Sequence, residues 1–148
     1  MLKHEVLFVC IHNSARSQMA EAFLNKYGEN FLHAGSAGLE PGKLNPNVVE
    51  VMKEIGIDIS NKGTQGVFDL FRQEKKYDAV ITVCDEASAE QCPIFPGKSK
   101  RIAWSFPDPS SFTGSREEIL NRTRGVRDLI EEKVKDFIAQ TKEYKYWL

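Results

Sequence analysis

Glu-Val-Leu-Phe-Val-Cys-Ile-His-Asn-Ser-Ala-Arg-Ser, residues 5–17, is the segment from which the architecture of the chain can be worked out. Residues 5–10 form a short apolar run, which is typical of a buried strand. From Ser17 the pattern changes, because apolar side chains recur at helical spacing until Gly28 supplies a stop signal. The segment therefore predicts a strand, a loop over residues 10–17 and a helix.

The remaining chain continues this alternation of strands and helices. Apolar runs predict further strands at residues 31–36, 78–84 and 101–104. Helical patterns separate or follow them, at residues 45–56, 67–71 and 126–138. Such alternation is typical of an α/β protein whose four-stranded parallel sheet is covered by helices on both faces. A chain of 148 residues favours one domain, so residues 1–148 are expected to form a single unit.

The composition argues against several classes of function. The formal net charge is −1, so no strong overall field attracts nucleic acid or a membrane surface. No apolar stretch approaches the roughly 18 residues of a membrane span, and no secretory signal precedes the first strand. The three cysteines, Cys10, Cys84 and Cys92, do not look like a secreted disulfide framework. We therefore expect a cytoplasmic protein with reduced thiols.

The loop over residues 10–17 has the composition of an anion-binding site. A loop that enters a helix N-terminus points successive backbone N–H groups inward, and Arg16 adds a planar guanidinium that can bind two oxygens. The same positive field favours the thiolate of Cys10, and Ser17 can donate a hydrogen bond to it. The loop thus predicts a thiol nucleophile aimed at a bound tetrahedral oxyanion. We expect the oxyanion to be bound by Ile11, His12, Asn13, Ser14, Ala15 and Arg16.

Asp108 and His12 are further candidates. Asp108 follows the last predicted strand, and prolines on both sides stiffen the backbone around it. A carboxylic acid there can protonate a leaving oxygen, although an aspartate before proline is also common in ordinary turns. Together with the Cys10 loop, the catalytic interpretation is preferred. His12 is expected to contribute its backbone N–H, and tuning of Cys10 or the anion by its ring is the alternative.

Cys84 and Cys92 need a separate explanation. Metal binding is disfavoured because the pair lacks the tight spacing of most structural sites and no histidine shows ligand spacing. Burial would explain Cys84 at the end of an apolar strand, but it explains Cys92 poorly because polar residues surround it. A redox pair explains both thiols. If the segment between them is helical, a rise of about 1.5 Å per residue separates the Cα atoms by about 12 Å, whereas a disulfide requires about 7 Å or less. Disulfide formation would therefore unwind this segment.

The loop and the residues that follow it, Gln18-Met19-Ala20-Glu21-Ala22, resemble the thioredoxin-coupled arsenate reductases. These share the fold of the low-molecular-weight protein tyrosine phosphatases, so the resemblance implies the strand order 2-1-3-4. The likeness covers most of the chain to about residue 110 and resumes in the last helix. It continues in Ser36-Ala37-Gly38, Asn45-Pro46, Asp58-Ile59-Ser60-Asn61, Val83-Cys84, Cys92-Pro93 and the segment from Trp104 to Pro109.

The resemblance also implies a reaction. Cys10 would attack arsenate held by Arg16 and the loop amides, and Asp108 would assist the departure of hydroxide. Cys84 would then attack the sulfur of Cys10 and release arsenite, and Cys92 would attack Cys84 to free Cys10. One new disulfide supplies the two electrons that arsenic(V) takes to become arsenic(III). Thioredoxin, or glutaredoxin in its place, would reduce the final disulfide, phosphate would compete with arsenate, and no cofactor is implied.

The chain departs from the family pattern at three places. Some relatives carry a further cysteine where Ala15 stands, but the reaction above does not need it. Many relatives have glycine where His12 stands. Some bind potassium through positions resembling Asn13, Glu21 and Ser36 and a segment near Thr64. Here residues 63–66 lack the acidic residue expected in that segment, so a potassium ion is not expected.

Two other functions stay open at this point. The nearest alternative is a phosphatase that hydrolyses phosphotyrosine or another phosphomonoester, because phosphate and arsenate are nearly isosteric. Hydrolysis has no use for Cys84 and Cys92, and Ser110-Ser111 stand where tyrosine phosphatases usually carry aromatic residues. A protein that only sequesters arsenite or a metal is the third interpretation, but it has no need of Arg16 and Asp108.

Overall fold

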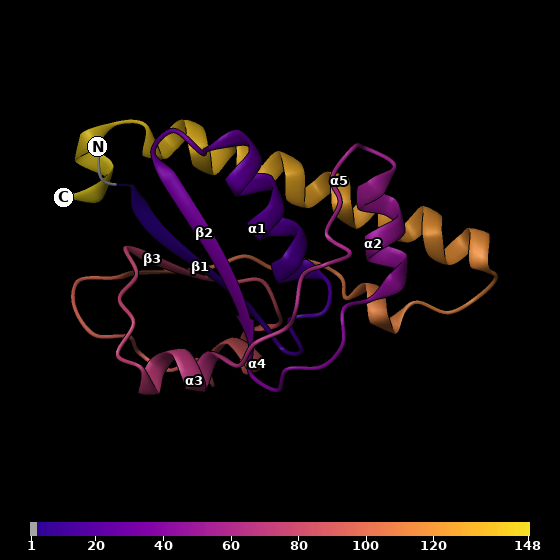
Figure 1. Ribbon diagram of the computed structural model, residues 1–148, viewed down its shortest axis with the longest axis horizontal. Helices are drawn as coiled ribbons and strands as arrows, with labels where there is room; N and C mark the ends of the chain where they lie inside the picture. The colour runs from indigo at the N-terminus through magenta and orange to yellow at the C-terminus, as the bar shows by residue number, and fades with distance from the viewer. Residues whose placement is uncertain (1–2) are drawn as a thin grey trace.

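The computed structural model describes residues 3–148, in which four strands form a parallel sheet (Figure 1). The strands are β1 (His4–Cys10), β2 (Leu32–Gly38), β3 (Ala79–Thr82) and β4 (Lys100–Ala103). They are arranged in the order β2-β1-β3-β4, and every neighbouring pair is parallel. The predicted α/β class and the strand order 2-1-3-4 are confirmed. Because the strands run in one direction, their carboxyl ends, including Cys10, lie along the same edge of the sheet.

Helices cover both faces of this sheet, as predicted. α1 (Arg16–Tyr27), α2 (Pro46–Lys53) and α5 (Arg116–Thr141) lie on one side, and α3 (Val67–Arg72) lies on the other (Figure 1). α4 (Glu86–Ala89) follows β3, and two short 3-10 helices are η1 (Pro109–Ser111) and η2 (Tyr144–Trp147). Among the helices of residues 3–148, none is long and apolar enough to cross a membrane.

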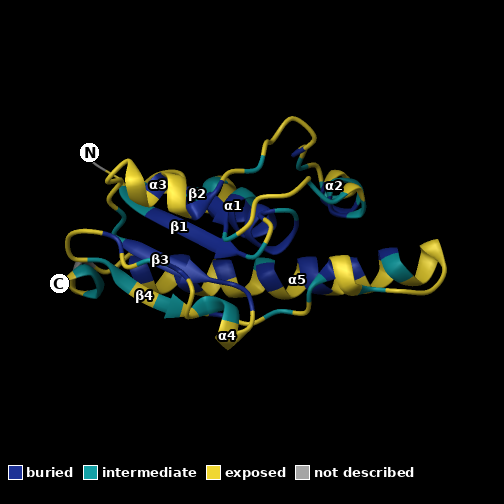
Figure 2. Ribbon diagram, turned by 90° about the horizontal axis from the view of Figure 1, so that it is seen from below, coloured by how far each residue is buried: buried dark blue, intermediate teal, exposed yellow. Residues whose placement is uncertain are grey.

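Alternation of side chains along β1 divides the core into two apolar clusters. Val6 and Phe8 face the side of α1 and α5, whereas Leu7 and Val9 face the side of α3. All four side chains are fully buried, and Figure 2 shows most of β1 in the dark blue of buried residues. A strand buried on both faces reads as a continuous apolar run, which is why the sequence predicts β1 so clearly.

Local signals explain where the helices begin. The Asn45 side chain accepts the N–H of Asn47 at the start of α2, and Ser115 and Glu118 form a capping box at the start of α5. The start of α1 is different, because Ala15 provides no side-chain cap and the first turn contains no acidic residue. The N-terminal N–H groups of α1 are therefore left for a ligand.

The region after β3 differs from the sequence prediction. A strand was expected through Cys84, but β3 ends at Thr82. Val83 still donates its N–H to the sheet, and the chain then turns because the Asp85 side chain accepts the N–H of Ser88 and caps α4. The segment between Cys84 and Cys92 is only partly helical, since α4 is a single short turn.

Candidate functional site

The carbonyl groups of the loop are held on its outer side. The backbone of residues 39–42 runs beside the loop and donates hydrogen bonds of 2.8, 2.9 and 3.0 Å to the carbonyls of residues 10–12. The next two carbonyls accept Gln18 Nε2 at 3.1 Å and the Asn45 N–H at 2.9 Å. A trans peptide places each N–H opposite the preceding carbonyl, and no cis peptide occurs in residues 3–148. The amides of residues 11–15 therefore point to the inner side of the loop.

The Cys10 sulfur accepts two hydrogen bonds from this loop. Its Sγ lies 2.9 Å from Ser17 Oγ and accepts the backbone N–H of Asn13 at 3.2 Å. The Asn13 carboxamide donates to Ser17 Oγ at 2.8 Å, which leaves the serine proton free for the sulfur. Since Asn13 and Ser17 are fully buried, water does not compete for these donors. The arrangement stabilises a sulfur anion.

Arg16 occupies the first position of α1 with its guanidinium almost completely buried. Its Nη1 donates to the Phe106 carbonyl at 3.2 Å, and its Nη2 lies 3.7 Å from Asp108 Oδ2. Its buried Nε finds no hydrogen-bond partner within residues 3–148. A buried N–H without a partner is costly, and an oxygen of a bound oxyanion would satisfy it.

Asp108 is oriented by its own turn. Its Oδ1 accepts the N–H of Ser110 at 3.0 Å at the start of η1, so its Oδ2 faces Arg16. The side chain is 33% exposed, which leaves the carboxyl group in contact with solvent protons. The structure thus brings together Cys10, Arg16, Ser17 and Asp108 from segments that are far apart in the sequence.

A buried polar network lies behind the loop, and it includes Lys62, which the sequence analysis did not single out. Ser36 Oγ accepts Asn13 Nδ2 at 2.9 Å and donates to Glu21 Oε1 at 2.8 Å, and Lys62 forms an ion pair with the other oxygen of Glu21. Glu21 is 5% exposed, so Lys62 is its counter-charge. The network connects the Lys62 ammonium to the hydrogen bonds at Cys10. A signal existed, because Ser17 and Glu21 are polar residues at i and i+4 on the buried face of a helix.

The side chains of Gln18 and Asn13 connect the loop to residues 63–65. Gln18 Nε2 donates to the Gly63 carbonyl at 3.0 Å, and Asn13 Oδ1 accepts the N–H of Gln65 at 3.0 Å. Asn13 also has a left-handed backbone, with φ of 56°, which asparagine tolerates better than most residues. Asn13 is therefore a structural centre of the loop as well as a donor to the sulfur.

His12 points away from the sulfur. Its Nδ1 lies 2.9 Å from the Glu40 carbonyl, and its side chain is exposed. Because its own carbonyl is bound by residues 39–42, the peptide after His12 is fixed without help from the ring. This placement favours the backbone role expected for His12 over the alternative role of its imidazole.

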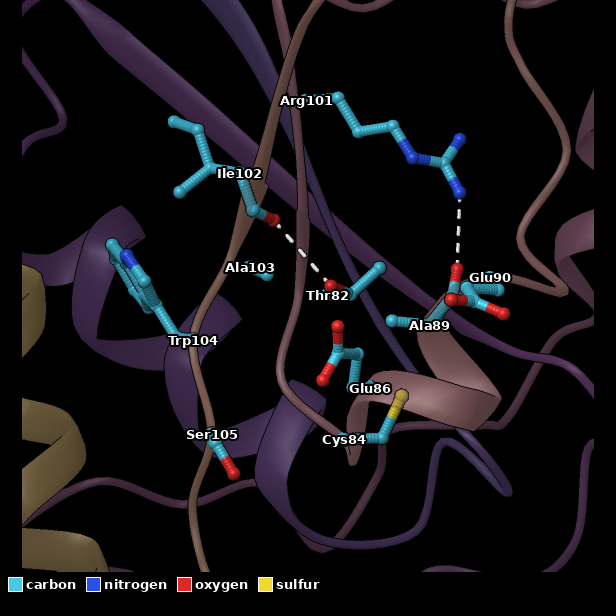
Figure 3. A pocket seen from close by; sticks show the side chains of 10 residues that line it. All are labelled: Thr82, Cys84, Glu86, Ala89, Glu90, Arg101, Ile102, Ala103, Trp104 and Ser105. Atoms are coloured by element: carbon cyan, nitrogen blue, oxygen red, sulfur yellow. Dashed lines mark hydrogen bonds between the residues drawn. The ribbon is translucent and has the colours of Figure 1, made fainter.

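Cys84 lies in the same apolar cluster as Cys10 and is buried. Burial raises the pKa of its thiol from 9.0 to about 11, while the charge of Arg16 lowers this pKa and that of Cys10 raises it. Cys84 therefore shares the electrostatic surroundings of the loop. A cavity of about 550 Å³ opens beside Cys84 between α4 and β4 (Figure 3).

The burial of Cys92 differs from the expectation based on the sequence. Its polar neighbours in the chain argued against burial, yet it is only 4% exposed and belongs to the cluster on the α3 side, with Val80 and Phe95. The reason is that the backbone around Cys92 is bonded to Arg101 of β4, which directs the thiol toward the sheet. Burial raises the pKa of the Cys92 thiol, and the Arg101 charge opposes this. All three cysteines are free thiols.

No metal centre is suggested by the described part of the chain. Within residues 3–148, histidine, cysteine, aspartate and glutamate form no group of three or more that could hold an ion.

Comparison with known protein families is consistent with an anion-binding loop that carries a nucleophilic cysteine. Residues 5–146 match the family described as low molecular weight phosphotyrosine protein phosphatase. The chain belongs to this family.

Individual relatives indicate which members of the family the chain resembles in sequence and structure. The arsenate reductase of Halalkalibacterium halodurans is 42% identical over 139 residues, which are 93% of this chain and 96% of the relative. The structure of arsenate reductase from Archaeoglobus fulgidus is 31% identical with a TM-score of 0.72, covering 90% of this chain and 98% of that one. A thioredoxin-dependent arsenate reductase of Corynebacterium glutamicum is 29% identical with a TM-score of 0.60, covering 90% of this chain and 63% of that one. Within the family, the chain groups with the arsenate reductases.

Proposed function

We propose that the protein reduces arsenate to arsenite through a relay of its three cysteines, and that thioredoxin reduces the enzyme afterwards. The single observation that carries the proposal is the pairing of an anion loop around Cys10 with two further buried free thiols. Similarity to arsenate reductases over 93% of the chain supports arsenate as the oxyanion. We place the reaction in the cytoplasm, where such thiols stay reduced.

In the first step, the Cys10 thiolate attacks the arsenic atom of arsenate. The loop amides and the unpartnered Arg16 Nε bind the oxygens, and the electrostatic field of the α1 N-terminus stabilises their charge. One oxygen leaves as water after it takes a proton from Asp108, which faces Arg16. The product is a covalent sulfur–arsenic(V) adduct on Cys10.

In the second step, the Cys84 sulfur attacks the sulfur of Cys10. A sulfur–sulfur bond forms, and the electron pair of the sulfur–arsenic bond stays on arsenic, which leaves as arsenite. Arsenic gains two electrons and the two thiols lose two, so the step balances. The raised pKa of Cys84 means that it must lose its proton as it attacks, and the charge of Arg16 favours that loss.

In the third step, the Cys92 sulfur attacks Cys84 and releases Cys10 as a thiolate. The Cys84–Cys92 disulfide that remains is then reduced by a dithiol protein. The similarity to a thioredoxin-dependent arsenate reductase favours thioredoxin, and glutaredoxin is the alternative donor. No electrons are exchanged with a bound cofactor in this scheme.

The test is arsenate-dependent oxidation of NADPH in the presence of thioredoxin and its reductase. Wild-type protein is expected to turn over. Cys84→Ser and Cys92→Ser are expected to lose turnover while they keep hydrolysis of an aryl phosphate at Cys10. Full reductase turnover in both variants would exclude the relay. Glutaredoxin with glutathione is assayed in parallel to identify the donor.

Hydrolysis of phosphomonoesters is a second candidate activity. It is favoured by the family match and by the proximity of Asp108 to Arg16, which suits protonation of a leaving alcohol. We expect it to be weak, since Ser110-Ser111 after Asp108-Pro109 offer no aromatic surface for a substrate ring. Phosphate is expected to inhibit arsenate reduction competitively.

A further inference from the structure

Arg101 connects the sheet to the segment that carries Cys92 through side-chain hydrogen bonds. From β4, its guanidinium donates hydrogen bonds to three carbonyls of residues 89–93. The distances are 3.0 Å to Ala89, 2.8 Å to Cys92 and 3.3 Å to Pro93. Figure 3 shows the bond to Ala89 among the residues that line the cavity beside Cys84.

These bonds hold the end of α4 as well as Cys92. Carbonyls at a helix C-terminus lack partners and carry partial negative charge, so a guanidinium there is favourable. The Ala89 carbonyl also accepts the N–H of Cys92 at 3.1 Å, so the C-terminus of α4 and the backbone of Cys92 are held together. Arg101 thereby fixes the backbone of Cys92 while its thiol packs against the α3-side cluster.

The fixed arrangement conflicts with the third step of the relay. Cys84 packs in the cluster on the α1 side of the sheet, and Cys92 packs in the cluster on the α3 side. Because the two thiols pack in different clusters, and a disulfide holds its sulfurs only about 2 Å apart, they can bond only if the segment between them moves. The cavity of about 550 Å³ between α4 and β4, lined by Cys84, Ala89 and Arg101, gives the segment room to move.

We propose that Arg101 is a positioning residue that holds the dithiol form of the Cys84–Cys92 pair and that its hydrogen bonds to residues 89–93 must open before Cys92 attacks Cys84. This inference rests on the proposed relay. Attack by the Cys92 thiolate forms the Cys84–Cys92 bond and breaks the Cys10–Cys84 bond, with Cys10 leaving as the thiolate. Arg101 thus stabilises the dithiol form relative to the disulfide form of the pair.

The test isolates this pair in full-length protein that carries Cys10→Ser, so that any intramolecular disulfide joins Cys84 and Cys92. The pair is equilibrated with reduced and oxidised dithiothreitol, and the fractions are read by mass spectrometry after alkylation. Adding Arg101→Lys keeps the charge but removes the fork that spans three carbonyls. We expect this change to favour the disulfide about tenfold, which lowers the reduction potential by about 30 mV. Amides of residues 85–92 are expected to exchange about tenfold faster in the dithiol form of this variant.

Arg116→Lys is the matched control, since Arg116 pairs with Glu50 on the surface and is expected to change neither quantity. Arg101→Gln serves as a second variant, and urea unfolding verifies that each variant is folded. Unchanged potential and unchanged exchange in both Arg101 variants would overturn the role of Arg101 alone. Failure of the pair to oxidise at any dithiothreitol ratio with Arg101 intact would instead overturn the relay on which it rests.

Discussion

At the scale of single residues, Asn13 combines an unusual backbone with a fully bonded side chain. Replacing it with alanine removes donors to the buried Ser17 and Ser36 and leaves the N–H of Gln65 without its acceptor. We expect Asn13→Ala to lower the free energy of unfolding by about 3 kcal/mol, because each buried group left unpaired costs roughly 1–3 kcal/mol. Urea unfolding measures this loss.

The control for Asn13→Ala is Glu74→Ala. Glu74 has a similar left-handed backbone, with φ of 58°, but its side chain is exposed. Because glutamate and alanine both carry a Cβ atom and pay a similar penalty in this conformation, its replacement is expected to change the free energy of unfolding by only about 0.5 kcal/mol or less. Equal losses in the two variants would mean that the carboxamide bonds of Asn13 contribute nothing.

Lys62 is expected to stabilise the folded protein by compensating the negative charge of the buried Glu21. Lys62→Met leaves a buried carboxylate without its counter-ion, and we expect a loss of about 2 kcal/mol in unfolding free energy, less than for a fully buried pair because Lys62 is half-exposed. Adding Glu21→Gln is expected to restore part of the loss, so the double variant is more stable than Lys62→Met alone. Additive losses in a double-mutant cycle would contradict the ion pair. Lys53→Met provides the surface control.

At the scale of elements, the carboxyl end of β2 shapes the anion loop by close approach. A Cβ atom at Gly38 would lie 2.7 Å from the backbone nitrogen of Asn13, so Gly38→Ala must displace the loop. We expect this variant to lose at least tenfold in the rate of Cys10 alkylation by iodoacetamide. Gly35→Ala, three residues earlier on β2, meets nothing nearer than 3.9 Å and is expected to react like the wild type. Equal rates in both variants would show that the contact does not shape the loop.

Most elements could be predicted from the sequence, because their signals are local. β1 and β3 are buried on both faces and read as apolar runs, and α2 begins at an asparagine cap followed by proline. The end of β3 was misplaced because Val83 and Cys84 continue the apolar pattern after the strand has ended. The Asp85 cap decided that boundary, and such a cap outweighs one more apolar residue.

The candidate site could be predicted only where it is contiguous in the chain. The loop from Cys10 to Ser17 contains its own nucleophile, guanidinium and hydroxyl group, so residue type and order were sufficient. The network behind it joins residues on β2, α1 and the loop at Lys62, and nothing in the local sequence pairs them. The burial of Cys92 likewise depends on Arg101, which lies on a separate strand.

At the scale of the whole molecule, stability and turnover are expected to respond to alkaline pH in opposite directions. The pKa of Cys84 rises from 9.0 to about 11 on folding, so the folded state keeps a proton that the unfolded state loses. This contribution to stability is complete below pH 9 and is lost as pH rises toward 11. Turnover limited by the attack of Cys84 is expected to increase with pH over the same range, since only the thiolate attacks.

Both pH effects can be measured on one pair of proteins. Urea unfolding of the wild type and of Cys84→Ser is compared from pH 8 to pH 10.5, and the difference in unfolding free energy is expected to shrink as pH rises. Single-turnover arsenate reduction by the wild type gives the rate. A constant difference in stability, together with a rate that does not change with pH, would rule out a neutral Cys84 in the resting enzyme.

The separation of the cysteines into two clusters on opposite sides of the sheet has a consequence for the order of binding. Oxidising equivalents would enter at the loop of Cys10 and leave from Cys92, which packs on the other layer. The binding site for the inorganic anion is then separate from the surface that contacts the electron donor. The two ligands can therefore bind to the enzyme at the same time. When thioredoxin reduces the preformed Cys84–Cys92 disulfide, we expect saturating phosphate to leave the KM for thioredoxin unchanged, because the two ligands occupy different sites.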